Sequence, residues 1–241
     1  HHCGLDAIAK LSSLDHNYLD NGYWASEYND ELPANGITAT FILGMEDVTE
    51  QILIGISPDT APGERQAKID KAIQDYKGRL RLREGEIQVK SFYYGNQYIA
   101  IHSITYTDVR LVGTPPSSIG KFGSDTDNWV WPRHNGDFSL FRIYTDREGR
   151  PADFSPNNIP LIPKYSLPVS LDGIDDGDFT LVYGFPGKTQ EYLPACAIEQ
   201  IVSEVNPLRI AIRDKALNIM DSDMKSDPKV RLAYASRYAK I

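Results

Sequence analysis

Apolar and polar positions alternate along much of the first 145 residues, which is the pattern of half-buried β-strands. Gly95-Asn96 separates two of the alternating stretches and is typical of the turn of a β-hairpin. This pattern predicts a β-rich body. Its strands are expected at residues 37–43, 51–56, 87–94, 98–112 and 138–144, with a later one at 179–185.

Helical spacing of apolar residues interrupts this alternation. A short helix is expected close to the start, and Pro62 to Arg81 has the charged and apolar faces of an amphipathic helix covering a sheet. Two further helical patterns follow at 201–220 and 228–241. We therefore predict a β-rich domain over residues 1–200 with an inserted helix near 62–81, and the start of a helical domain over 201–241.

Composition narrows the class of protein. The chain has 241 residues, of which 41% are hydrophobic and 24% charged, as in ordinary globular proteins. Its net charge of −8 argues against a nucleic-acid partner, because phosphate binding requires clustered Lys and Arg. Apolar runs such as Ile52–Ile56 are too short to span a bilayer, so no membrane span is expected.

The ends and the cysteines leave several points open. The chain begins at His1 without Met, so we expect it to be incomplete, and His1-His2 could also be a tag remnant. Cys3 and Cys196 could pair with each other, or Cys3 could pair with a residue upstream. The number of cysteines therefore assigns no redox compartment.

Two residues have the surroundings expected of a catalytic pair. His2 precedes a cysteine at the start of a helix, and Asp137 precedes an alternating strand. A carboxylate that accepts the imidazole Nδ1–H fixes the tautomer of a base histidine and stabilises its charged form. Each residue alone could instead be structural, His2 as a buried histidine and Asp137 as a turn residue. The remaining histidines His16, His102 and His134 are interpreted as structural, and no metal-binding motif is present.

The loop before Asp137 is unusually long and contains Trp129 and Trp131 beside acidic residues and Asn128. Loops of this length in compact domains are usually functional. With His-His-Cys-Gly at 1–4, this loop closely resembles the bacterial serine dipeptidyl-peptidases of the dipeptidyl-peptidase 7 and 11 type. The resemblance extends over nearly the whole chain and includes the segments 45–49, 121–137, 136–142, 171–187 and 190–194.

The resemblance implies a chymotrypsin-like double β-barrel, with the second barrel incomplete in this chain, followed by the start of an α-helical domain. It implies His2 as the general base and Asp137 as its orienting partner. Asn128 and Trp129 would bind the free α-amine of the substrate, since an amide oxygen accepts from an ammonium group and an indole face attracts a cation. The alternative for Trp129 is a packing role.

The nucleophilic serine is missing, because no Gly-Xaa-Ser-Xaa-Gly or Gly-Asp-Ser-Gly segment occurs in these residues. We therefore expect a fragment, inactive alone, of an enzyme that releases dipeptides from peptides with a free N-terminus. The resemblance further implies no metal or organic cofactor, a homodimer, and a periplasmic or cell-surface location in a bacterium. It leaves open whether the second substrate side chain is acidic or hydrophobic. The alternatives are a trypsin-like endopeptidase and a catalytically dead, protease-like binding module.

Overall fold

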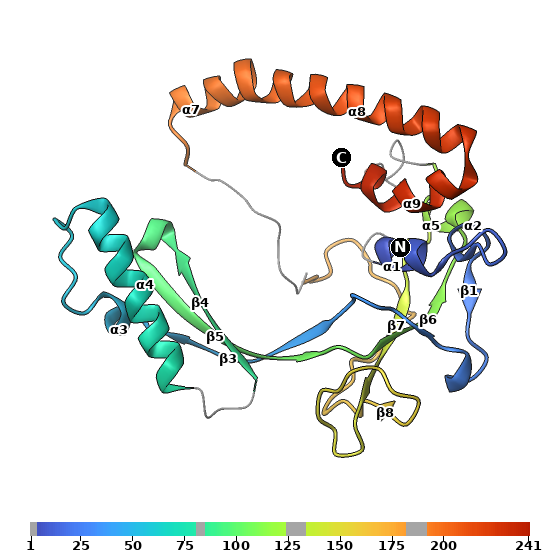
Figure 1. Cartoon of the computed structure of the whole chain (residues 1–241), viewed down its shortest axis with the longest axis horizontal. Coiled ribbons are helices and arrows are strands. Elements are labelled where there is room, and N and C mark those ends of the chain that lie inside the picture. Colours follow the sequence, from blue (N-terminus) through green and yellow to red (C-terminus); the bar gives the residue numbers. More distant parts are fainter. Residues whose placement is uncertain (1–3, 81–84, 124–133, 182–191) are drawn as a thin grey trace. The chain divides into compact units, whose positions relative to one another are not determined.

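A computed structural model describes residues 4–80, 85–123, 134–181 and 192–241 (Figure 1). The chain divides into two compact units, which are described separately below. The first combines His1–Leu11 with Tyr18–Leu161, and the second combines Ser12–Asn17 with Ile162–Ile241.

The first unit contains an antiparallel sheet in which β6 is the central strand. The order is β1-β6-β7-β8, and the short strand β2 also pairs with β6. Short helices precede or follow these strands. The elements are α1 (Leu5–Leu11), α2 (Tyr18–Asn21), β1 (Tyr23–Trp24), η1 (Tyr28–Asp30), β2 (Leu32–Pro33), β6 (Val109–Thr114), α5 (Ser117–Gly120), β7 (Leu140–Thr145) and β8 (Ile159–Pro160).

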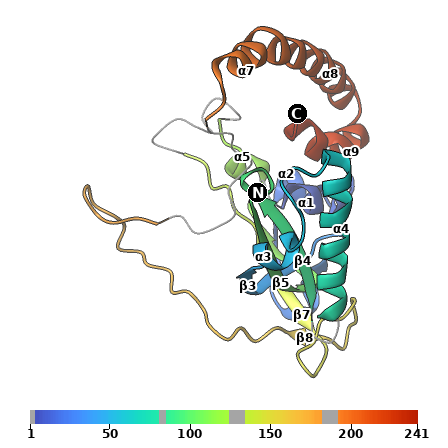
Figure 2. The same ribbon diagram turned by 90° about the vertical axis from the view of Figure 1, so that its left-hand side faces the viewer.

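A second antiparallel sheet in the same unit has the order β3-β5-β4. Its strands are β3 (Ala39–Asp47), β4 (Glu86–Phe92) and β5 (Gln97–Tyr106), and the turn η2 (Tyr93–Gly95) joins the last two. The helices α3 (Thr49–Leu53) and α4 (Pro62–Arg79) accompany this sheet, and α4 runs along it in both views (Figure 1, Figure 2). The amphipathic helix expected from Pro62 is thus present.

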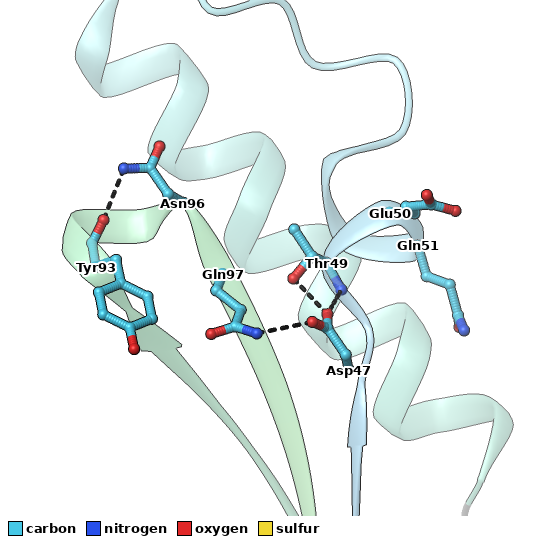
Figure 3. A pocket seen from close by; sticks show the side chains of 7 residues that line it. All are labelled: Asp47, Thr49, Glu50, Gln51, Tyr93, Asn96 and Gln97. Carbon is cyan, nitrogen blue, oxygen red and sulfur yellow. Dashed lines mark hydrogen bonds between the residues drawn. The ribbon is translucent and has the colours of Figure 1, made fainter.

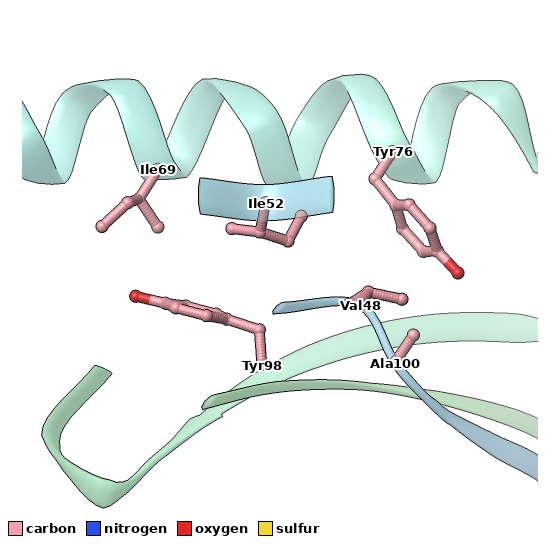
Figure 4. Close-up of a cluster of buried hydrophobic side chains, with 6 residues drawn as sticks. All are labelled: Val48, Ile52, Ile69, Tyr76, Tyr98 and Ala100. Atoms are coloured by element: carbon pink, nitrogen blue, oxygen red, sulfur yellow. The ribbon is translucent and has the colours of Figure 1, made fainter. Parts of the chain in front are cut away.

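The core of this sheet lies between β5 and the two helices. Ile69 and Tyr76 point from α4 toward the sheet, and Ile52 of α3 fills the space between them (Figure 4). Ile52 and Ala100 are fully buried, at 0% exposure. Burying a side chain of the size of Ile contributes about 1.5–3 kcal/mol, so this cluster is a main source of stability for the sheet and its helices. The remaining members of the cluster are Val48 and Tyr98.

The prediction of a strand at 51–56 was wrong, because Thr49–Leu53 forms the helix α3. Asp47, the last residue of β3, lies two positions before the helix, and its Oδ1 accepts hydrogen bonds from the backbone N–H and the hydroxyl of Thr49, the first helical residue. Val48 and Ile52, four residues apart, are then buried on one side of a single helical turn. A short apolar run fits a buried strand and a buried helical turn equally well, so periodicity alone could not separate them.

The stretch 98–112, predicted as one strand, is divided between the two sheets. β5 ends at Tyr106 and β6 begins at Val109. The break coincides with two polar side chains that bind a distant loop: the Thr107 hydroxyl donates to the carbonyl of Ala152 at 3.0 Å, and Asp108 binds the side chain of Asn158. The chain therefore changes sheet where its side chains bind residues about 45 positions later.

Helices dominate the described part of the second unit. They are α7 (Ala195–Gln200), the π-helical turn η3 (Ile201–Val205), α8 (Asn206–Ser226) and α9 (Pro228–Ala239). The two predicted helices are therefore present, although the first begins at Ala195. Asp227 caps α9 by accepting a hydrogen bond from the Lys229 N–H at 2.7 Å. Residues 179–181 of the strand predicted at 179–185 are not in a strand, and the rest of it lies outside the described residues.

The architecture is a combination of sheets and helices with a half-barrel sheet. The double barrel and the domain boundary near residue 200 stay predictions. Within the described ranges, no helix is long and apolar enough to cross a membrane.

Candidate functional site

Asp137 lies in a tight turn that leads into β7. The N–H of Gly136 donates to the carbonyl of Ile119 at 3.0 Å, and the N–H of Phe138 donates back to the carbonyl of Gly136 at 3.1 Å. The first bond fixes the turn to the end of α5, and the second closes it around Asp137. The Asp137 side chain is exposed.

Close packing on β1 and β6 supports the turn from the other side. The rings of Trp24 and Phe138 are 6.1 Å apart, and Trp24 also covers Gly113, with which it pairs across the sheet. A Cβ atom on Gly113 would lie 2.4 Å from Cε3 of Trp24, so only glycine allows the indole to lie there. Because Gly113 also pairs with Leu140 of β7, the strands β1 and β6 together hold the start of β7 in place.

Gly4 brings the N-terminal segment against the same turn. A Cβ atom added to Gly4 would lie 2.4 Å from Oγ of Ser139 and 3.1 Å from Cε2 of Phe141. Gly4 follows the predicted base His2 by two residues, and Ser139 follows Asp137 by two residues. Two chain segments separated by more than 130 residues therefore meet directly after the two residues predicted to form the catalytic pair.

Three of the four predicted site residues, His2, Asn128 and Trp129, lie outside the described residues, as does Cys3. Cys196, in contrast, has an exposed thiol that is not in a disulfide. In the described ranges, no group of three or more His, Cys, Asp or Glu side chains could hold a metal ion.

A partly buried network of charged and polar side chains, which sequence reasoning missed, joins Glu31, just before β2, to β7. Arg142 Nε donates to Oε1 of Glu31 at 2.7 Å, and the Tyr144 hydroxyl donates to Oε2 of the same carboxylate at 2.9 Å. Burial, and then the hydrogen bond to Glu31, raise the pKa of Tyr144 to about 12. Arg142 within an apolar strand was the available signal, but nothing in the sequence pairs it with a residue 111 positions earlier.

Asp108 and Arg110 form a second, fully enclosed part of this network. Arg110 donates from Nε and from its second terminal nitrogen to the two oxygens of Asp108, at 3.0 and 2.8 Å. Burial raises the pKa of Asp108, but hydrogen bonds from Arg110 and Asn158 outweigh it, so the pKa lies below its usual value. The Arg110 guanidinium also lies 3.6 Å from the centre of the Tyr144 ring and donates to the Ser155 carbonyl.

A separate pocket of about 710 Å³ lies at one end of the second sheet (Figure 3). Its polar lining includes Asp47, Glu50, Tyr93 and Gln97. Asp47 has a structural role there, because hydrogen bonds from the side chain of Thr49, and then from Gln97, lower its pKa while they hold α3 to the sheet. Asp137, the predicted site residue within the described ranges, does not line this pocket.

The chain is similar to solved structures of Porphyromonas endodontalis DPP11, two of which are named as complexes with a dipeptide. The crystal structure of Porphyromonas endodontalis DPP11 in complex with the dipeptide Arg-Asp matches with a TM-score of 0.90 and 39% identity, over 100% of this chain and 35% of that one. The Asp/Glu-specific dipeptidyl-peptidase of Flavobacterium psychrophilum is 52% identical over 242 residues, and dipeptidyl-peptidase 7 of Capnocytophaga gingivalis is 42% identical over 244.

Residues 1–241 match the model of the peptidase S46 family, and the chain belongs to that family. Both of these alignments include 100% of this chain but only 34% of the length of each relative. The chain therefore spans about a third of the length of the curated relatives it matches. The resemblance inferred from the sequence is confirmed.

Proposed function

We propose that the whole protein to which this chain belongs is a serine dipeptidyl-peptidase with a chymotrypsin-like double β-barrel. It releases dipeptides from peptides that have a free N-terminus. The observation that carries the proposal is the 52% identity to an Asp/Glu-specific dipeptidyl-peptidase along the entire chain. Residues 1–200 would supply part of the barrels, and 201–241 would begin the helical domain.

In the proposed reaction, His2 takes the proton of a serine hydroxyl that lies outside these 241 residues. The serine oxygen bonds to the carbonyl carbon of the second substrate residue, and His2 then gives the proton to the departing amine. Water attacks the resulting ester in the same way and releases the dipeptide. Asp137 accepts the Nδ1–H of His2 throughout and stabilises the charged imidazolium.

The contact between Gly4 and Ser139 supports this pairing. Two residues of extended chain reach at most about 7 Å, so Asp137 lies within that distance of the contact, and Gly4 follows the proposed base by two positions in the sequence. Both proposed members of the pair therefore precede, by two positions in the sequence, residues that contact each other.

Asn128 and Trp129 are proposed to bind the substrate ammonium group, which is how the enzyme would count two residues from the N-terminus. A trypsin-like endopeptidase would share His2 and Asp137 but would need no such binding site. We further propose an acidic side chain at the second substrate position, because relatives named Asp/Glu-specific are 52% and 50% identical to this chain. A neighbouring structure named as a complex with Arg-Glu supports the same preference.

The test uses the full-length protein and coumarin substrates with free or acetylated N-termini and with Asp, Glu or Leu at the second position. We expect hydrolysis of free-amine substrates ending in Asp or Glu, and none of their acetylated forms. His2→Ala should abolish activity, and Asp137→Asn should lower kcat by about 10⁴-fold, as the corresponding change does in trypsin-like enzymes.

Other outcomes would lead to different conclusions. Equal cleavage of acetylated substrates, unaffected by Asn128→Ala, would favour the endopeptidase. Full activity of His2→Ala would overturn the proposed mechanism, and inactivity of the intact protein on all substrates would favour the binding module. A preference for Leu would overturn the acidic specificity alone.

The location and assembly of the whole protein are also proposed. We propose a periplasmic or cell-surface enzyme that forms a homodimer. Fractionation of the native bacterium and light scattering of the purified full-length protein test the two statements independently. Recovery in the cytoplasmic fraction would overturn the first, and the mass of a monomer would overturn the second.

A further inference from the structure

The strand β3 has an apolar outer edge. In the order β3-β5-β4 it pairs with β5 on one side, and among the described residues no strand pairs with its other side. Four large apolar side chains lie close together here and are between 38% and 64% exposed; they are Phe41, Ile42, Leu43 and Met45. Single exposed apolar side chains are common on protein surfaces, but a contiguous group of them usually marks a contact.

The opposite edge of the same sheet is different. Exposed residues of β4 include Glu86 and Lys90, and they alternate with Ile87 and Val89, which pack against the buried cluster of this sheet. Charged residues on an outer strand oppose pairing with another strand, whereas an apolar strand without charge or proline favours it. Residues 40–45 contain neither a charged residue nor proline. β4 therefore has the sequence of a free edge, and β3 does not.

The exposed apolar residues lie on both faces of β3. Phe41 and Ile42 are neighbours in the sequence and pair with Ile104 and Ser103 of β5, so their side chains point to opposite faces of the sheet. A layer packed on one face would require apolar residues only at alternate positions. A strand added at the edge contacts side chains on both faces, because its residues lie directly beside those of β3. The pattern therefore fits an added strand better than a covering helix.

Contacts near both ends hold β3 in place for such pairing. The rings of Phe41 and Tyr106 pack edge to face with their centres 5.7 Å apart, and Glu46 accepts a hydrogen bond from the hydroxyl of Tyr76 on α4. Between these contacts, a Cβ atom on Gly44 would meet no atom within 4 Å apart from those of its chain neighbours. The strand is thus already ordered, so a partner strand would not have to pay for ordering it.

We propose that, in the whole protein, a strand from outside these 241 residues pairs with the outer edge of β3 and covers residues 41–45. This chain spans 34% of the length of the curated relatives, so about two thirds of that length is available to supply the strand. A segment of the same polypeptide stays close to the edge at every protein concentration, which protects the apolar strand from pairing between molecules. The added strand carries apolar side chains on both of its faces, to match those of β3.

A second copy of the protein fits this position less well. Two copies related by a two-fold axis would pair β3 with β3. The pairing of β3 with β5 is irregular between Ile42 and Gly44, where Leu43 has no partner residue. A bulge of this kind disrupts the ladder and bends the strand, so two bulged strands side by side would lose pairing twice.

The first measurement compares two residues that are both apolar and both exposed in this chain. Met45 on β3 is 64% exposed, and Ile54, directly after α3, is 80% exposed. In the full-length protein, Met45→Lys should raise hydrogen-exchange rates in residues 39–47 by about tenfold or more, because it places a charge beneath the added strand. Ile54→Lys is the matched control, and exchange in residues 49–56 should stay within about twofold of the native rates. Equally small effects of the two substitutions would overturn the inference.

Thiol labelling of milder variants measures the cover directly and does not depend on the folding of Met45→Lys. Met45→Cys and Ile54→Cys are treated with a maleimide in the native full-length protein, and each labelled peptide is quantified by mass spectrometry. Met45→Cys should react at least about tenfold more slowly, because labelling requires the added strand to open. Similar rates for the two cysteines would show that the edge is free, and the inference would be wrong.

Two further measurements identify the source of the strand. In a dilution series followed by light scattering, the protection of Met45→Cys should be the same at every concentration; protection that disappears on dissociation would assign the cover to a second copy. A photo-reactive p-benzoylphenylalanine at position 43 should cross-link to a peptide outside residues 1–241, and a cross-link within them would equally contradict the inference. None of these measurements uses catalysis, so an inactive but protected protein would contradict the proposed function alone.

Discussion

The buried pair Asp108–Arg110 provides the sharpest test of the packing in the first unit. The two side chains are 1% and 8% exposed and are joined by a bidentate contact. Asp108→Asn removes the negative charge while it preserves the size of the side chain. The guanidinium of Arg110 is then left enclosed between aromatic rings without its counter-ion.

Removing one partner of a buried ion pair costs about 3–5 kcal/mol, because the remaining charge is no longer compensated. Arg110 also binds the carbonyl of Ser155, so the cost should fall on β6 and on the loop 151–158 that the pair holds. Hydrogen exchange measured by mass spectrometry on the full-length protein tests this. A loss of 3 kcal/mol in local stability raises exchange rates in β6 and in this loop by on the order of a hundredfold.

Asp221→Asn is the control, since its partner Lys225 is exposed on α8 and the contact of 2.6 Å is similarly short. Exchange around Asp221 should change by at most a few-fold, because solvent-exposed pairs contribute little. The double variant Asp108→Asn with Arg110→Met should recover most of the protection, since it leaves no buried charge. Equal exchange in the double and single variants would refute the argument from uncompensated charge.

Three further predictions follow from burial and backbone geometry. The pKa of Tyr144 is raised to about 12 because the folded protein favours the neutral hydroxyl. This preference contributes about 3 kcal/mol to the free energy of unfolding below pH 10, and the contribution is lost as the pH rises through 12. Tyr144→Phe should reduce the slope of alkaline unfolding, and an identical slope would contradict this. Tyr94 has a φ of 58°, a left-handed conformation that is strained for tyrosine and easier for asparagine. Tyr94→Asn should therefore stabilise the protein by up to about 1 kcal/mol, and any loss of stability in a denaturant titration would contradict this. Ile52→Ala should cost about 2–5 kcal/mol in the same titration, whereas a cost below 1 kcal/mol would show that the core closes around the gap.

The sequence predicts the fold well where one periodicity persists. The helix from Pro62 and the strand ending at Thr145 extend over enough residues to show a clear pattern. The prediction was wrong at Ile52, where five residues are too few to distinguish a helical turn from a strand. It also missed the break after Tyr106, because the side chains that cause it bind residues near position 152.

The site could be predicted as a set of residue types but not as an arrangement. A histidine before a cysteine and an aspartate before a strand pointed to His2 and Asp137. The contact between Gly4 and Ser139 had no signal, since a glycine in a loop is usually explained by its own backbone. Glu31 was missed for a related reason: its partner Arg142 comes from a strand 111 residues later.

The π-helical turn Ile201–Val205 affects how relatives of different length can be compared. The chain runs through α7, this turn and α8 without interruption, and Pro207 is the second residue after the turn. A π-helical turn holds one more residue than an α-helical turn, and each residue of an α-helix advances the rotation by about 100°. A relative that lacks one residue here would keep both helices, but α7 would be turned by that angle relative to α8. A gap of one position in an alignment would then mean that, relative to α8, the relative turns a different face of α7 outward. The residue at the position of Cys196 would then lie on a different side of the helix.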